Sequence, residues 1–235
     1  MIFLLLMTSL LGFFDPIGPA TASSGGDLST AEITGLSITG DAGAVRITTD
    51  ADRPYVASLA GRRSGWFSGW YSNWFFNACE TGSRMHVTNG VLQIEVRSNS
   101  WMDISDCTVE IVANIPSGNA VAIALSAVQA RFAGDFKSLA VSARAGDVSL
   151  VGHAEAITLK SQAMRASLDF DKVTKREDVA IDVQNLDATI NLRPETPISY
   201  SVKTVMSYVD SSLPNTDGAR PHFAFNAERA HIRIR

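Results

Sequence analysis

A segment of eighteen residues recurs without a gap between residues 128 and 170 of this chain. Phe132, Leu150 and Leu168 occupy equivalent positions in successive copies. Around these positions, and in a second run within each unit, apolar or small residues alternate with polar ones, which is the period of a β-strand. A repeat this short cannot bury its own apolar face, so its copies must stack with equivalent side chains in ladders. The repeat therefore predicts an all-β fold, a β-solenoid.

The alternating pattern extends in both directions from this repeat and is most regular over residues 110–214. The Asn89-Gly90 step predicts a tight hairpin turn between two earlier strands. Residues 171–178 insert about four extra positions into the spacing, so we predict coils of about 18 to 22 residues.

The last apolar runs, residues 222–226 and 231–235, are predicted to form a final pair of strands. Arg233 and Arg235 alternate along the second run. We expect this strand to lie at the exposed end of the stack, because charged side chains there discourage edge-to-edge pairing.

The composition favours one domain with a substantial core. Hydrophobic residues make up 46% of the 235 residues, and charged residues 19%. The net charge is -4, and no dense run of lysine and arginine supplies the footprint of a nucleic-acid-binding protein. We predict a single domain over residues 33–235, preceded by a flexible lead-in over residues 23–32 that is rich in serine, glycine and threonine.

The N-terminus has the pattern of an export signal. Residues 2–14 are almost wholly apolar, which suits a signal-peptide core and falls short of the ~20 residues of a transmembrane helix. Ala20-Thr21-Ala22 has the small-x-small form of a cleavage site. No lysine or arginine precedes the apolar run, so the alternatives are a true start that lies upstream and an uncleaved anchor. We predict a signal peptide over residues 1–22, cleaved after Ala22, and a periplasmic or cell-surface location.

The chain contains two cysteines, Cys79 and Cys107. An even number of cysteines in an exported chain favours a disulfide, and two buried free thiols are the alternative. A bridge closing a loop of ~30 residues would stabilise the fold by about 3 to 4 kcal/mol in the chain-entropy model. We predict the bridge.

The stretch 61–79 interrupts the β pattern and is the sharpest functional feature of the sequence. Seven aromatic residues occur within the eleven positions 66–76, between glycine, serine and asparagine residues. Such a stretch either packs as a cap on one open end of the stack or binds a partner, namely a glycan, a lipid surface or a protein. The candidate ligand-binding residues are Arg62, Arg63, Trp66, Phe67, Trp70, Tyr71 and Trp74.

No catalytic or metal-binding motif is present. The four histidines are scattered, and the acidic pairs lack the spacing of a calcium-binding repeat, so we predict no metal and no cofactor. Arg131, Ser149 and Arg165 are expected to point outward in one stack, on a basic and hydroxylated face without a carboxylate cluster. Hydrolases and lyases need such a cluster, so we predict a protein that is not an enzyme, with a carbohydrate-active β-helix enzyme as the alternative.

Several features resemble the bacterial putative-adhesin family of exported β-solenoid domains. They are the Ile115-Pro116 turn that opens the short-period ladder, the late Ser207-Tyr208-Val209-Asp210 segment and the closing Ile-Arg-Ile-Arg strand. The resemblance covers about residues 33–235 and implies a right-handed single-stranded β-helix or β-roll of unknown biochemical function, with no catalytic residues to carry over. The aromatic stretch and the cysteines are not part of that pattern.

Together these observations predict a cell-envelope binding module that contacts an envelope glycan, a membrane surface or a protein partner. A purely structural scaffold, in which the aromatic stretch is a buried cap, is a further alternative.

Overall fold

The computed structural model describes residues 21–23, 26–63, 78–97, 107–192 and 196–235. These ranges contain twelve β-strands and no helix, and all twelve strands belong to one sheet. This confirms the all-β prediction. The strands are β1 (Thr21–Ser23), β2 (Asp27–Ser29), β3 (Gly35–Thr48), β4 (Val56–Arg63), β5 (Ala78–Cys79), β6 (Arg84–Thr88), β7 (Val91–Val96), β8 (Cys107–Asn114), β9 (Ala120–Phe170), β10 (Asp178–Asn191), β11 (Ser199–Ser211) and β12 (His222–Ile234). Among the described residues, none forms a helix capable of spanning a membrane.

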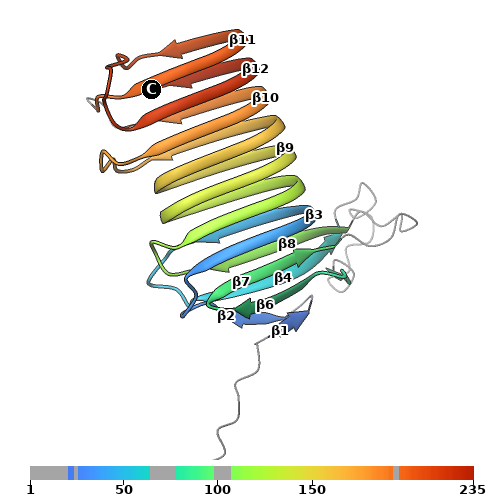
Figure 1. Ribbon diagram of the computed structural model, residues 1–235. Helices are drawn as coiled ribbons and strands as arrows, with labels where there is room; N and C mark the ends of the chain where they lie inside the picture. The colour runs from blue at the N-terminus through green and yellow to red at the C-terminus, as the bar shows by residue number, and fades with distance from the viewer. Residues whose placement is uncertain (1–20, 24–25, 64–77, 98–106, 193–195) are drawn as a thin grey trace, which may run out of the picture.

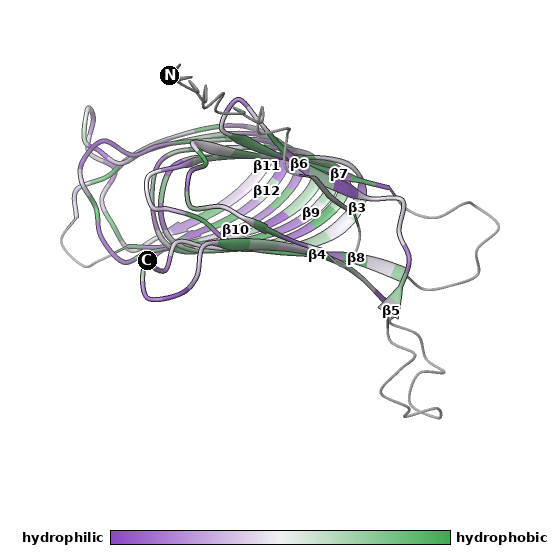
Figure 2. Cartoon of the chain, turned by 90° about the horizontal axis from the view of Figure 1, so that it is seen from below, coloured by the Kyte–Doolittle hydropathy of each residue, from purple (hydrophilic) through white to green (hydrophobic). Residues whose placement is uncertain are grey.

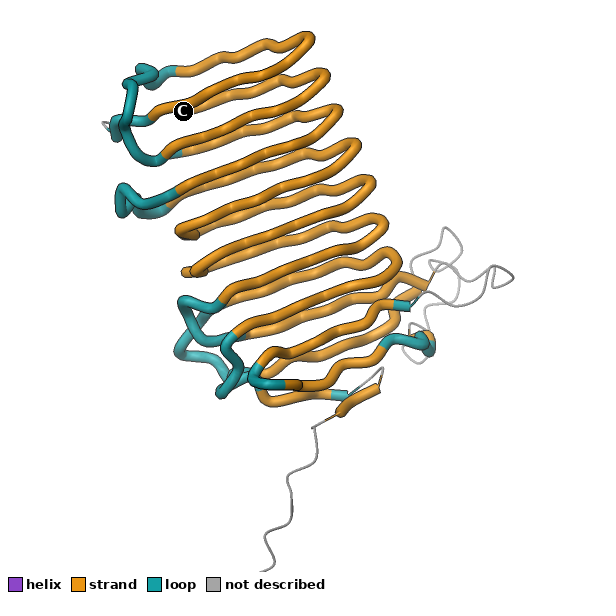
Figure 3. Tube along the Cα trace, in the orientation of Figure 1, coloured by secondary structure: helices purple, strands orange, loops and turns teal. Residues whose placement is uncertain are grey.

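The predicted repeat lies in β9, which runs through several successive stacked layers (Figures 1 and 3). Equivalent positions in adjacent layers follow the eighteen-residue spacing of the sequence. A Cβ atom added to Gly146 would contact the side chains of Val128 and Met164, one layer on either side, at 3.3 and 3.1 Å. Both β3 and β10 pair with β9 in parallel.

The core is a set of side-chain ladders that run through the stack. In one of them Ile47 pairs with Phe132, and Leu168 pairs with Ile190, which pairs in turn with Ile234. All five side chains are buried. Complete burial of each stabilises the fold by about 1.5 to 3 kcal/mol, so the ladder is a main source of stability. Seen from below (Figure 2), the layers overlie one another around an elongated cross-section. The buried hydrophobic side chains form one core cluster.

The strand order at the C-terminal end differs from the prediction. Residues 222–234 form one strand, β12, and it lies between β10 and β11 with parallel pairing on both sides. The expectation that the strand carrying Arg233 and Arg235 ends the stack is therefore wrong. The outermost strand is β11, which precedes β12 in the sequence. Alternation of apolar and polar residues is the same in every layer, so it carries no information about which strand lies outermost.

The N-terminal end of the sheet contains antiparallel strands. β6 and β7 form the predicted hairpin, with Thr88 opposite Val91 across the Asn89-Gly90 turn. β4 pairs with β8, and the short β1 and β2 pair with β6 and β4 on the outside. β2 lies within residues 23–32, the stretch expected to be a flexible lead-in, and Leu28 and Thr30 in that stretch are buried.

Candidate functional site

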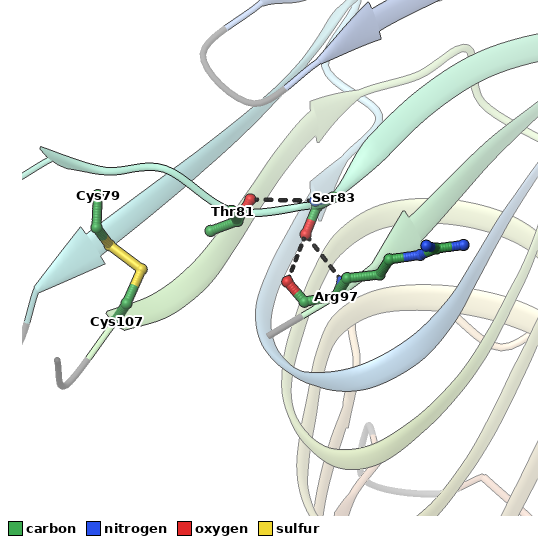
Figure 4. The surroundings of a disulfide bond; sticks show 5 residues. All are labelled: Cys79, Thr81, Ser83, Arg97 and Cys107. Atoms are coloured by element: carbon green, nitrogen blue, oxygen red, sulfur yellow. Dashed lines mark hydrogen bonds between the residues drawn. A yellow bond between two sulfur atoms is a disulfide. The ribbon is translucent and has the colours of Figure 1, made fainter. Parts of the chain in front are cut away.

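The two cysteines form a disulfide at the N-terminal end of the stack (Figure 4), as predicted. Their Cα atoms are 6.2 Å apart. Cys79 ends β5 and Cys107 begins β8, and these two strands pair with opposite edges of β4. Gly61 of β4 is opposite Cys79, and Arg63 is opposite Cys107, so the bridge fixes the end of β4 from both sides.

The end of β7 is attached to the same corner. The hydroxyl of Ser83 accepts a hydrogen bond from the backbone N–H of Arg97 at 3.0 Å and donates one to its carbonyl oxygen at 3.3 Å (Figure 4). The N–H of Ser83 donates in turn to the hydroxyl of Thr81, at 3.4 Å. Arg97 is thereby tied to the segment that follows Cys79.

Four chain positions therefore meet at this disulfide-tied corner: Arg63, Ala78, Arg97 and Cys107. Residues 64–77 connect the first pair, and residues 98–106 connect the second. The candidate residues Trp66, Phe67, Trp70, Tyr71 and Trp74 lie in the first of these stretches, outside the described residues.

Of the predicted ligand-binding residues, the side chain of Arg62 is described. It is exposed and forms an ion pair with Glu110 of β8, with 2.5 Å between Nε and Oε2. An exposed pair of this kind contributes at most about 1 kcal/mol to stability. The guanidinium lies at the edge of the disulfide-tied corner.

A second candidate place is a column of polar side chains on the outer surface of the stack. It consists of Asp147, Arg165, Asp187, His231 and Tyr208, at matching positions of successive layers. Arg165 lies 3.9 Å from Asp147 and 3.9 Å from Asp187, and Nδ1 of His231 lies 3.5 Å from Oδ1 of Asp187. The ring centroids of Tyr208 and His231 are 5.4 Å apart.

This column forms one wall of an open groove of about 710 Å³. Met164, Leu186 and Ala230 belong to the inward ladder and form its apolar floor. Asn185 and Arg229 stand on the opposite wall and are hydrogen-bonded to each other at 3.3 Å. The groove runs across the layers from β9 to β11.

The expectation of an outer face without a carboxylate cluster is wrong at this groove. Arg165 is in register with Asp187 and does not share a column with Ser149. Two features concealed the cluster. Arg165 matches Asp147 in the eighteen-residue spacing, and Asp147 is the outward residue that comes before Ser149. The insertion at residues 171–178 lengthens the spacing between Arg165 and Asp187.

The polar groups of the groove have unused hydrogen-bonding capacity. Contacts of 3.9 Å are too long for hydrogen bonds, so Arg165 and its two carboxylates do not satisfy one another. Oδ1 of Asp187 is shielded from solvent and has no hydrogen-bond partner among the described residues. Charged planar groups beside an exposed tyrosine on an apolar floor suit a ligand that is rich in hydroxyl groups. No group of three or more potential metal ligands occurs in the described ranges.

A buried acid lies apart from both places, in the connection between β9 and β10. Glu177 is fully buried and accepts hydrogen bonds from the backbone N–H groups of Thr174 and Arg176, from the Thr174 hydroxyl and from Nε2 of His153 at 2.9 Å. Burial raises the pKa of Glu177, but hydrogen bonds from the Thr174 backbone, the Thr174 hydroxyl and His153 outweigh it and hold the pKa below its usual value. Glu177 therefore organises this connection as a carboxylate.

Comparison with known proteins finds similarity at the level of structure. A putative cell adhesion protein from Clostridium sporogenes has a TM-score of 0.47 and 12% identity, over 92% of this chain and 99% of that one. A putative adhesin from Bacteroides fragilis has a TM-score of 0.39 and 14% identity, over 93% and 98%. A putative adhesin from Parabacteroides distasonis has a TM-score of 0.34 and 8% identity, over 91% and 97%. No protein-family model and no curated protein matches the chain.

Proposed function

We propose that this chain is a non-enzymatic, adhesin-like binding module of the bacterial cell envelope. Its frame is a single-stranded β-solenoid, and it contacts a surface, glycan, lipid or protein partner through the aromatic stretch 61–79. The observation that carries the proposal is the disulfide-tied corner, where both ends of this stretch are fixed to the rigid stack.

The regular parallel register supports the solenoid. Asp178 pairs with Ala156 of the layer before it, and Ser199 pairs with His222 of the strand that follows it in the chain. Both separations along the sequence are only slightly longer than the eighteen-residue spacing inside β9. Such pairings are those of coils with similar length that stack on one another.

The disulfide supports export. Structural disulfides persist in oxidising compartments such as the periplasm and the cell surface, and they are rare in the cytosol. Export fits a signal peptide over residues 1–22. Cleavage after Ala22 would remove most of β1, which is the short strand outside β6.

The corner suits a binding role because it fixes the base of the contact region in advance. A partner that binds an anchored stretch immobilises fewer groups than one that binds a free chain, and the entropic cost of binding is correspondingly lower. Residues 98–106 include Trp101 and leave from the same corner. Tryptophan, tyrosine and arginine are the residue types that most often dominate binding energy.

Removal of the aromatic side chains should strongly weaken partner binding. We expect the native chain to co-sediment with one of three envelope fractions: anionic liposomes, outer-membrane vesicles or peptidoglycan. Replacement of Trp66, Trp70, Tyr71 and Trp74 by serine should weaken this binding at least ~30-fold, since single anchors of this kind contribute about 2 kcal/mol or more. Unchanged binding by a folded variant would contradict the proposal.

The matched control replaces Tyr200 by serine, at the opposite end of the stack, and should still bind. Thermal unfolding distinguishes two reasons why the serine variant would not bind: loss of contacts with the partner, or loss of packing on the fold. If the serine variant loses several degrees of melting temperature, the aromatic side chains pack on the fold, and the structural-cap alternative holds.

The groove favours a second candidate function, a carbohydrate-active enzyme. Asp147 and Asp187 stand on either side of Arg165 in an open groove, and glycoside hydrolysis uses a pair of carboxyl groups that flank the bond to be cut.

We expect the chain to leave envelope polysaccharides uncut, as measured by the release of reducing ends. Cleavage that is lost in Asp187→Asn and kept in Asp182→Asn would favour the enzyme instead. Asp182 is an exposed aspartate on the other arm of β10 and lies outside the groove.

A further inference from the structure

The C-terminal end of the stack is open. β11 is the last strand of the sheet and pairs with β12 along its inner edge. At the start of its outer edge, the side chain of Asn215 takes the place of a partner strand. Its Oδ1 accepts from the N–H of Tyr200, and its Nδ2 donates to the carbonyl oxygen of Tyr200, both at 2.9 Å. Beyond the bridge between Ile198 and Asn215, no described strand pairs with this edge.

Large apolar side chains gather on this open strand. Four large hydrophobic residues are exposed in the described ranges, and three of them are Val205, Met206 and Tyr208 of β11, at 89%, 69% and 63%. The inward residues Tyr200, Val202 and Val209 of the same strand are only partly buried. A bare strand edge with apolar side chains is a surface that proteins normally cover or pair.

We propose that β11 is a dimerisation edge, at which it pairs antiparallel with β11 of a second copy of this chain, so that the two stacks join end to end. A second copy supplies the same unpaired edge, and a two-fold axis at the middle of the strand satisfies both edges at once. Val205 is the midpoint of β11 and lies at that axis.

Charge disfavours the parallel orientation. Lys203 precedes the midpoint of β11. Parallel pairing in register would set it opposite the same lysine of the second copy, whereas antiparallel pairing centred on Val205 sets it opposite Ser207.

The two-fold contact itself limits the assembly to two copies. It uses the β11 edge of both copies, so neither copy keeps a free β11 edge for a third. Such a self-complementary contact produces a dimer that does not extend into a filament.

Light scattering coupled to size exclusion tests the proposal on the chain from Ser23 to its C-terminus. The expected mass is twice that of the chain. The double substitution Val205→Lys and Met206→Lys places two charges at the interface and should weaken the dimer at least about tenfold. At the same concentration this variant should have the mass of one copy of the chain. Val151→Lys is the matched control. Val151 is the fourth exposed large hydrophobic residue, at 59%, and lies on β9 away from the edge. This variant should remain dimeric.

A second measurement avoids any dependence on folding of the lysine variant. Val205→Cys should be joined to a second copy by a short bifunctional thiol reagent, whereas Val151→Cys should not. A native chain with the mass of one copy at all concentrations, or cross-linking that is equal at the two positions, would overturn the proposal. Assemblies larger than two copies would overturn it as well.

Discussion

Replacing Gly152 by valine should destabilise the fold by about 3 to 5 kcal/mol, from backbone strain and overpacking together. Gly152 has a φ angle of +138°, which side-chain-bearing residues rarely adopt. A Cβ atom there would lie 2.2 Å from the carbonyl oxygen of Gly134, one layer away, and 2.8 Å from its nitrogen. Both contacts are with backbone, so relief requires the two layers to separate. In a chain of this size the melting temperature should fall by roughly 10 °C.

Gly118→Val is the control that separates the two causes. Gly118 also has a positive φ, +75°, but a Cβ atom there would meet no atom within 4 Å. Its substitution should show the cost of the backbone conformation alone, about 1 to 3 kcal/mol. Thermal unfolding followed by circular dichroism measures both variants. Equal losses would mean that contact between the layers is not what requires glycine at position 152.

Replacing Glu177 by alanine should cost about 3 to 5 kcal/mol. The substitution removes a buried carboxylate and leaves its donors from Thr174, Arg176 and His153 without an acceptor. Glu155→Ala is the matched control, because Glu155 is exposed and lies close to His153 in the sequence. Denaturant unfolding should show a change within about 0.5 kcal/mol for the control. A small loss for Glu177→Ala would mean that water replaces the carboxylate.

The same carboxylate should make stability depend on pH. Its pKa is lower in the folded protein than in the unfolded chain, where it is about 4.3, so the folded state favours the charged form. The contribution of Glu177 is complete above the unfolded pKa and is lost as the pH falls through the folded pKa. Glu177→Gln cannot titrate, and its stability should decline less than that of the native chain between neutral pH and about pH 3. Parallel curves for the two proteins would contradict this assignment.

The local features of the fold could be predicted from the sequence because each depends on near neighbours. The eighteen-residue spacing placed Phe132 and Leu168 in the core ladder, and Asn89-Gly90 indicated the hairpin. The disulfide followed from the number of cysteines and the expected compartment. Each of these predictions rests on a repeat period or on a composition that can be read directly from the sequence.

Features that depend on which layers meet could not be predicted in this way. The position of β12 inside the sheet has no local signal, because β10, β11 and β12 alternate alike. The pairing of Arg165 with Asp187 depends on a register set by the insertion at 171–178. That insertion is polar in sequence, yet it contains Glu177, which is buried and hydrogen-bonded to His153 in the layer before it. All three features depend on the register between strands that are far apart in the sequence.

The internal position of β12 has a mechanical consequence. A stack whose last strand lay outermost could unravel from its end, losing one ladder of hydrogen bonds at each step. Here the first step would have to withdraw β12 from between β10 and β11, which breaks two ladders at once. A pull on the C-terminus therefore loads both neighbours together in shear, and the end of the chain resists peeling by proteases and by force.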